Sequence, residues 1–118
     1  MAIKRLERMS YKAERLVARL LGLKPTPKQA IFDLVDFTEG CAYEVKACST
    51  LALTSSNKIH IEDGAWARKQ AFLSEHGLEG ILMVVLITGK TSAELYRVPL
   101  TKQHMRISTI IKTGTRIA

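Results

Sequence analysis

Three charged residues in the first half of the chain have the types and the spacing of a hydrolytic site. Asp33 lies in the apolar run 31–37, and Glu44 and Lys46 lie two residues apart in the apolar run 41–48. Residues two apart on a strand project from the same face. Charges inside an apolar strand are costly to bury unless they are paired or bound to a metal. The pattern therefore predicts a strand face that carries chemistry.

A predicted hairpin decides which aspartate joins this acid and lysine. The two apolar runs are connected around Thr38–Gly40, and a short glycine-containing link of this kind is typical of a β-hairpin. Loops of two or four residues set Asp33 opposite Lys46, on the shared face. They set Asp36 opposite Tyr43, on the other face, and only an odd loop length would exchange the two aspartates.

Two carboxylates and a lysine on one face suit the hydrolysis of phosphodiester bonds. Mg²⁺ and Mn²⁺ prefer oxygen ligands, and they bind through one or two carboxylates together with water and substrate phosphate. Such an ion activates water and neutralises charge in the transition state. A neighbouring lysine orients or helps to deprotonate the water and contacts the phosphate. We therefore predict a Mg²⁺- or Mn²⁺-dependent nuclease with Asp33, Glu44 and Lys46 as its catalytic residues.

The same residues resemble a known family. An aspartate, ten further residues and then Glu-Val-Lys, on a hairpin that follows a helix, are similar to the motif of the PD-(D/E)XK nuclease superfamily. This group includes restriction enzymes, archaeal-type Holliday junction resolvases and many phage nucleases. The resemblance implies that Asp33, Glu44 and the backbone carbonyl of Val45 ligate the metal, and that Lys46 is the catalytic lysine. The sequence departs from the motif at Phe32, where the family has proline.

The resemblance also implies a restriction-endonuclease-like core and supporting residues on two helices. Glu14 on the first helix would join the metal ligands, and Lys69 or Gln70 on the second helix would support the site. Each has an ordinary alternative. A glutamate in an amphipathic helix is usually solvated, and the Lys69 side chain could extend to solvent past Trp66.

The remaining sequence predicts the elements that position the hairpin. Apolar periodicity, glycine stops and β-branched runs indicate helices and strands on both sides of it. The expected elements are a helix to Leu21 ended by Gly22, a stiff connector at Lys24–Lys28, a strand at Lys58–Glu62, a helix from Gly64 or Ala65 to His76 capped by Asp63 and ended by Gly77, a doubly covered strand at Ile81–Ile87, a strand at Glu94–Leu100, and a tail from Thr101 that forms a helix, a strand or both. This order predicts one α/β domain over residues 1–118, with a central mixed β-sheet flanked by helices.

The amino-acid composition and charge indicate what kind of protein this is and which partner it is expected to bind. The chain has 118 residues, of which 47% are hydrophobic, enough for a real core. Its net charge of +7 makes nucleic acid the first partner to consider, and the nuclease prediction makes DNA the expected one. Its apolar runs are too short to span a bilayer, and its N-terminus does not have the pattern of a secretory signal. We therefore expect no membrane association and a cytoplasmic location, which is the host cytoplasm if the protein is phage-encoded.

The cysteines and histidines add no site to this prediction. Cys41 and Cys48 do not have a zinc spacing and are expected to be reduced thiols. His60, His76 and His104 are distant in sequence, and we expect them to be unclustered surface or capping residues.

Two functions from different classes remain open at this stage. The first is a DNA endonuclease, either structure-selective like a resolvase or a homodimer that cuts two strands. The second is a non-catalytic basic module that binds nucleic acid on a nuclease-like fold. Only the first requires a divalent metal, so metal dependence discriminates between them.

Overall fold

The computed structural model describes residues 2–24, 30–49, 58–89 and 92–117, and within these segments it describes the side chains except those of residues 2–11 and 49. The connector expected at Lys24–Lys28 therefore lies, apart from its first residue, outside the described residues. The described helices are α1 (Ala2–Leu21), α2 (Asp63–His76) and α3 (Ile107–Thr113). The described strands are β1 (Leu34–Asp36), β2 (Cys41–Ser49), β3 (Lys58–His60), β4 (Glu79–Ile87), β5 (Ala93–Pro99), β6 (His104–Arg106) and β7 (Thr115–Arg116).

Five of these strands form one mixed sheet in the order β1-β2-β4-β5-β7. The long strands β2 and β4 are parallel, and every other neighbouring pair is antiparallel. The predicted α/β class with a central mixed sheet and flanking helices is confirmed. The strand expected at Lys58–Glu62 ends at His60 and pairs with β6 in a separate two-stranded sheet, which the sequence did not predict.

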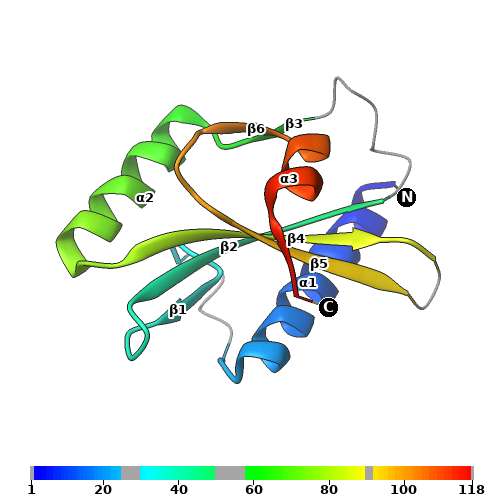
Figure 1. Cartoon of the computed structure of the whole chain (residues 1–118), viewed down its shortest axis with the longest axis horizontal. Coiled ribbons are helices and arrows are strands. Elements are labelled where there is room, and N and C mark those ends of the chain that lie inside the picture. The colour runs from blue at the N-terminus through cyan, green and yellow to red at the C-terminus, as the bar shows by residue number, and fades with distance from the viewer. Residues whose placement is uncertain (1, 25–29, 50–57, 90–91, 118) are drawn as a thin grey trace.

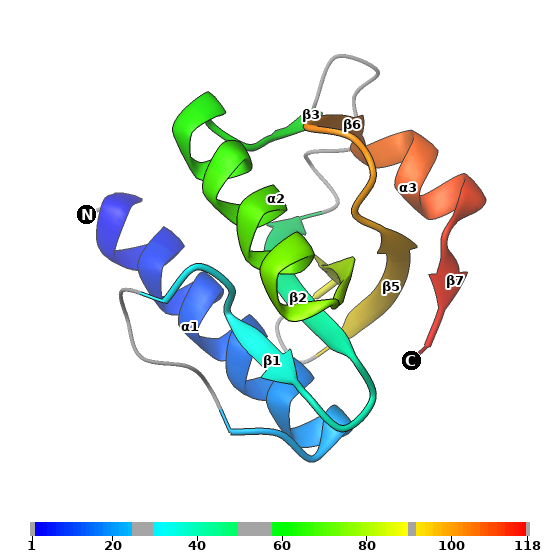
Figure 2. The same ribbon diagram turned by 90° about the vertical axis from the view of Figure 1, so that its left-hand side faces the viewer.

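The sheet is covered on both faces, as Figure 1 shows. α1 packs on one face through Ala13, Val17 and Ala18, and α2, α3 and the β3–β6 pair pack on the other. Figure 2 shows β1 at the near edge of the sheet, with α1 on one side of it and α2 on the other. None of the described helices is long and apolar enough to cross a lipid bilayer.

The continuous apolar run of β4 explains why this strand lies in the middle of the sheet. Strand geometry sends alternate side chains to opposite faces, and both faces of β4 are buried from Gly80 to Leu86. Ile81, Met83 and Val85 pack towards α1, whereas Leu82, Val84 and Leu86 pack towards α2. The prediction of a strand covered on both faces is confirmed.

Both predicted glycine stops are confirmed. Gly22 and Gly77 have φ values of 67° and 64°, in the left-handed region that glycine adopts without a Cβ penalty. The predicted N-terminal cap of α2 is wrong, because Glu62 occupies the cap position and Asp63 is the first helical residue. The Asp63 carboxylate instead accepts a hydrogen bond from the side chain of Gln103.

The hairpin loop has an even number of residues, as predicted, but the two strands pair in a different register. Four residues link Asp36 to Cys41, and these two residues are paired, so Asp36 does not lie opposite Tyr43. Asp36 Oδ1 accepts hydrogen bonds from the backbone N–H groups of Thr38 and Glu39, at 3.0 and 3.1 Å, which fixes the turn at this position. The pairing has shifted by two residues, so Asp33 falls beside Glu44 and not opposite Lys46. An even shift keeps the side chains of the paired residues Leu34–Asp36 on their predicted faces.

The close approach of α3 to β5 gives a testable prediction at Gly114. A Cβ atom there would lie 2.5 Å from the Ile110 carbonyl oxygen and 2.7 Å from Val98 Cγ1. We expect Gly114→Ala to lower the free energy of unfolding by about 1–3 kcal/mol in urea denaturation, since the backbone must move. The matched control is Gly64→Ala, whose Cβ has ordinary contacts at 3.4 and 3.5 Å. It should leave stability unchanged or raise it by up to about 1 kcal/mol, and equal losses in both variants would contradict the prediction.

Candidate active site

Asp33 lies at the edge of the sheet, immediately before strand β1 begins. Strand β1 begins only at Leu34, so the N–H of Val45 on β2 has no strand residue to pair with. The Asp33 carboxylate accepts this hydrogen bond through Oδ2, at 2.8 Å. Phe32 packs in the core on the α2 side and Leu34 in the core on the α1 side. Regular strand alternation is therefore broken between these two residues, and the Asp33 side chain is held at the edge of the sheet.

Glu44 is a carboxylate inside the apolar layer between the sheet and α2. It is 6% exposed. Ala42, two residues earlier on the same strand, projects from the same face and belongs to the core there. Two ammonium groups approach it: Lys46 Nζ lies 3.4 Å from Oε1, and Lys69 Nζ lies 2.6 Å from Oε2. Among the described residues, Oε2 accepts no hydrogen bond of good geometry, so the ion pair with Lys69 is its polar contact.

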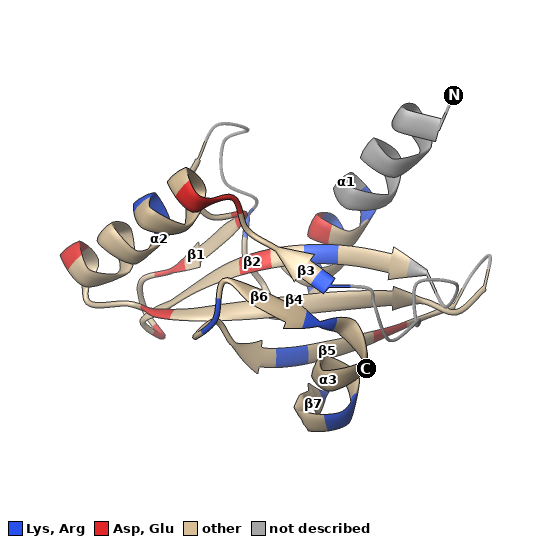
Figure 3. Ribbon diagram, turned by 90° about the horizontal axis from the view of Figure 1, so that it is seen from above, with Lys and Arg blue, Asp and Glu red and all other residues tan. Residues whose placement is uncertain are grey.

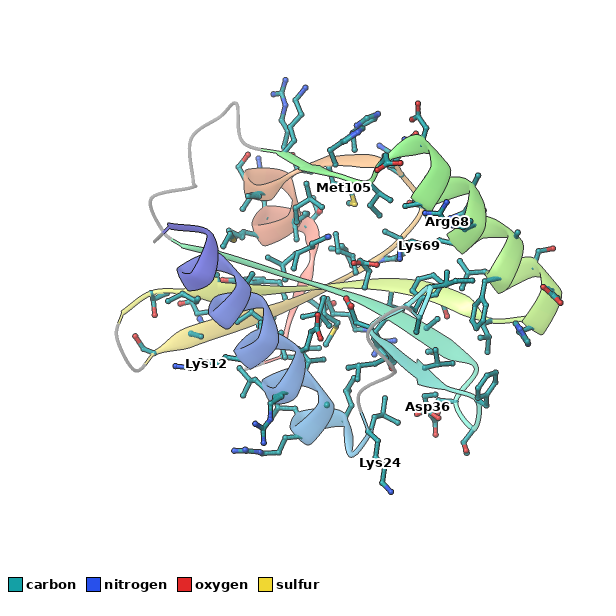
Figure 4. All side chains as sticks on the ribbon, turned by 180° about the vertical axis from the view of Figure 1, so that it is seen from behind. Lys12, Lys24, Asp36, Arg68, Lys69 and Met105 are labelled. Atoms are coloured by element: carbon teal, nitrogen blue, oxygen red, sulfur yellow. The ribbon has the colours of Figure 1, made fainter. Side chains whose placement is uncertain are left out.

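Lys69 comes from the middle of the apolar face of α2 and points towards the sheet, as Figure 4 shows. It is 9% exposed. Its ammonium group also donates a hydrogen bond to the backbone carbonyl of Ile31 and lies 4.7 Å from the centre of the Phe32 ring. The alternative in which Lys69 extends to solvent past Trp66 is therefore wrong. The other supporting candidate, Gln70, is exposed, and no described interaction connects it to these residues.

The Asp33 carboxyl group is buried close to other charged side chains. The pKa of Asp33 is raised from 3.8 to about 7, first by burial and then by the charge of Glu44. The hydrogen bond from Val45 opposes this shift, the charge of Glu14 adds to it, and the charge of Lys46 opposes it. Glu14 is half-buried on α1. The fold thus brings Asp33, Glu44, Lys46 and Glu14 to one edge of the sheet, and their roles in catalysis stay predictions.

The donors at this edge fit a small divalent cation. Among the described residues, no three His, Cys, Asp or Glu side chains are arranged as a metal-binding group. Mg²⁺, however, commonly uses one or two protein carboxylates and completes its shell with water and phosphate. The N–H and C=O of a strand residue point to the same side, so the Val45 carbonyl faces the edge where Asp33 lies. Two mutually repelling carboxylates and this carbonyl form an arrangement that positive charge stabilises.

No known protein-family model matches the chain, and no curated protein sequence shows significant similarity to it. The PD-(D/E)XK assignment therefore stays a prediction, carried by the spacing of Asp33, Glu44 and Lys46.

Sequence reasoning missed one cluster. The histidines were expected to be unclustered, but His60 and His104 are directly paired across β3 and β6, and their rings are stacked with centroids 4.4 Å apart. His76 packs against Phe72 and Phe37. The two paired histidines are 44 residues apart in the chain. No sequence signal could have joined them, because each strand has only three residues and its partner is not its neighbour in the sequence.

The raised pKa of Asp33 predicts a stability change with pH. Between about 4 and about 7, the folded state holds this proton more strongly than the unfolded state, so the contribution of Asp33 to stability falls as pH rises through this range. Asp33→Asn keeps an oxygen that can accept the Val45 hydrogen bond and removes the repulsion. We expect the stability of the variant relative to wild type to increase between pH 5 and pH 8 by on the order of 2 kcal/mol.

Urea denaturation in EDTA at the two pH values measures this difference. The matched control is Asp36→Asn, which keeps the turn oxygen and relieves no repulsion between buried carboxylates, so its stability at pH 8 should stay within about 0.5 kcal/mol of wild type. A pH-independent difference between Asp33→Asn and wild type would contradict the prediction.

Proposed function

We propose that this protein is a metal-dependent nuclease that hydrolyses phosphodiester bonds in DNA, and that it acts as an endonuclease with a PD-(D/E)XK-type site on a restriction-endonuclease-like core. The observation that carries the proposal is the pair of carboxylates, Asp33 and Glu44, beside the uncovered backbone of Val45 at the sheet edge. Hard oxygen donors beside a lysine are the groups that phosphodiester hydrolysis requires. When bound, Mg²⁺ or Mn²⁺ supplies positive charge that activates water and stabilises the transition state.

Lys46 and Lys69 differ in exposure, and we therefore assign them different roles. The Lys46 side chain is 42% exposed while its ammonium group stays 3.4 Å from Glu44, so it can orient water and contact a phosphate from solvent. The Lys69 side chain is 11% exposed and its ammonium group is paired with Glu44, so a substrate cannot reach it. We assign Lys46 as the catalytic lysine and Lys69 as a positioning residue that holds the Glu44 carboxylate.

The proposal extends to the partner, the assembly and the location of the enzyme. The net charge of +7 favours binding of a polyanion, and a domain of this size has little surface for reading a long sequence. We therefore propose that it selects DNA by backbone shape or branching, like a resolvase, or cuts two strands as a homodimer in the cytoplasm. Sedimentation velocity at micromolar concentration tests the homodimer, and a monomer in the presence of DNA would rule it out.

The central test is cleavage of duplex, single-stranded and four-way-junction DNA with Mg²⁺, Mn²⁺ or EDTA. We expect cutting that depends on the metal and is abolished by Glu44→Gln, because the neutral amide is a poor metal ligand. The matched control is Glu39→Gln, which removes one negative charge from the exposed hairpin turn and should cut at the wild-type rate. DNA binding without cutting under every metal condition would instead favour the non-catalytic basic module.

A second test separates the two lysines. We expect Lys46→Gln to lower the cleavage rate by about two to three orders of magnitude, with a loss of stability below about 1 kcal/mol because its ion pair is exposed on one side. Lys69→Met should lower the free energy of unfolding by about 3–5 kcal/mol, since it leaves a buried carboxylate unpaired. Urea denaturation and single-turnover cleavage measure both effects. Full activity of Lys46→Gln would overturn the assignment of the catalytic lysine.

A further inference from the structure

The outer face of the β3–β6 pair collects four basic or titratable side chains. The register pairs Lys58 directly with Arg106 and His60 directly with His104. Residues two apart on a strand share a face, so all four project from the same side, and all four are exposed. We call this surface the basic ribbon.

The opposite face of the ribbon is fixed to the body of the protein. Ile59 and Met105 alternate with the four exposed residues and pack into the core on the α2 side of the sheet. In Figure 4 the labelled Met105 points inward from its strand. Gln103, just before β6, donates hydrogen bonds from its side chain to the carbonyl of Ile61 and to the carboxylate of Asp63 at the start of α2. The basic ribbon is therefore a rigid surface joined to α2.

The charge of the ribbon is not balanced within the described part of the chain. Lys58 and Arg106 face each other directly, a like-charge arrangement that destabilises a strand pair. None of the ion pairs between described residues involves either of them. Figure 3 shows blue segments on both β3 and β6 and no red segment on either strand. An anion bound across the two strands would relieve this repulsion.

The paired histidines add hydrogen-bond donors to this surface. Their Nδ1 atoms lie within hydrogen-bonding distance, so one Nδ1 donates and the other accepts. A neutral histidine that accepts through Nδ1 carries its proton on Nε2. That N–H takes no part in the Nδ1 contact between the two histidines, and no hydrogen bond joins it to another described residue. The ribbon thus offers a hydrogen-bond donor beside a pair of cationic side chains, which is the chemistry that binds phosphate oxygens.

We propose that the basic ribbon is a contact surface for the phosphate backbone of DNA, outside the cleavage site. The inference rests on the proposed function in that the bound DNA is the substrate of the nuclease. DNA is favoured over an anionic membrane because surface association with lipid uses exposed apolar side chains beside the charges. The exposed large hydrophobic residues among the described ones are Leu16, Leu20, Phe37 and Ile117, none of which lies on the ribbon.

The test is binding of a fluorescent DNA duplex by the full chain in EDTA, so that no cleavage is needed for the readout. We expect Lys58→Gln combined with Arg106→Gln to weaken binding by on the order of tenfold near 0.1 M salt. The slope of log K against log salt should fall by about two, one for each lost phosphate contact. Thermal unfolding checks that the variant is folded. Exchanging the two residues, Lys58→Arg with Arg106→Lys, keeps the charge and should keep most of the affinity.

The matched control removes the same charge from another surface. Lys12→Gln combined with Lys24→Gln changes two exposed lysines on and just after α1, which lie on the other side of the molecule from Met105 in Figure 4. Weaker binding only in the ribbon variant supports the proposal. Equal losses in both double variants, a larger loss in the control, or stronger binding to anionic vesicles than to DNA would each overturn it.

The outcome is independent of the cleavage test. If wild-type protein binds DNA through the ribbon but cuts nothing with Mg²⁺ or Mn²⁺, the proposed nuclease fails and the ribbon stands. If the protein cuts DNA and the ribbon variant binds and cuts as wild type does, the ribbon fails and the nuclease stands.

Discussion

The structure depends on the burial of one carboxylate. Glu44 lies in the layer between the sheet and α2, where an unpaired charge would cost several kcal/mol. The covering helix supplies the counter-charge through Lys69, 2.6 Å away. The same ammonium group binds the carbonyl of Ile31, just before Asp33. One ionic contact therefore fixes the positions of β2, α2 and the segment that leads into β1, and the candidate site is assembled by the requirement that this carboxylate be neutralised.

A second constraint acts at Asp33, whose backbone N–H still donates to the Tyr43 carbonyl at 3.1 Å while its side chain takes the place of a backbone acceptor for Val45. If β1 extended regularly through this residue, a backbone carbonyl could occupy the position that the Asp33 carboxylate takes beside Val45. Burial of the Asp33 carboxylate, and then the nearby charge of Glu44, disfavour its charged form and raise its pKa. A carboxyl group whose pKa is strongly raised, as that of Asp33 is, occurs more often at functional sites than elsewhere in proteins.

Strong patterns in the sequence predicted much of the fold, and weak ones failed for identifiable reasons. The apolar run of β4 and the glycine stops at Gly22 and Gly77 determine local structure by themselves, so they could be recognised. The even length of the hairpin loop was predictable, whereas the pairing register was not, because Asp36 accepts hydrogen bonds from the turn and shifts the register. The direction of the Lys69 side chain could not be predicted, because helical spacing allows its ammonium group to point inwards or outwards. Only the three-dimensional position of Glu44 decides between the two.

The arrangement of charge explains why the net value of +7 says little by itself about function. Lys69 is used internally and is not available to a ligand, and Lys46 is shared between Glu44 and solvent. The basic ribbon lies outside this network but is connected to it, since Gln103 joins β6 to the start of α2 and Lys69 joins α2 to Glu44. A polyanion bound on the ribbon would therefore be placed relative to the carboxylates by a short series of fixed contacts. The same lysine that makes burial of Glu44 tolerable is therefore one of the contacts that connect the two surfaces.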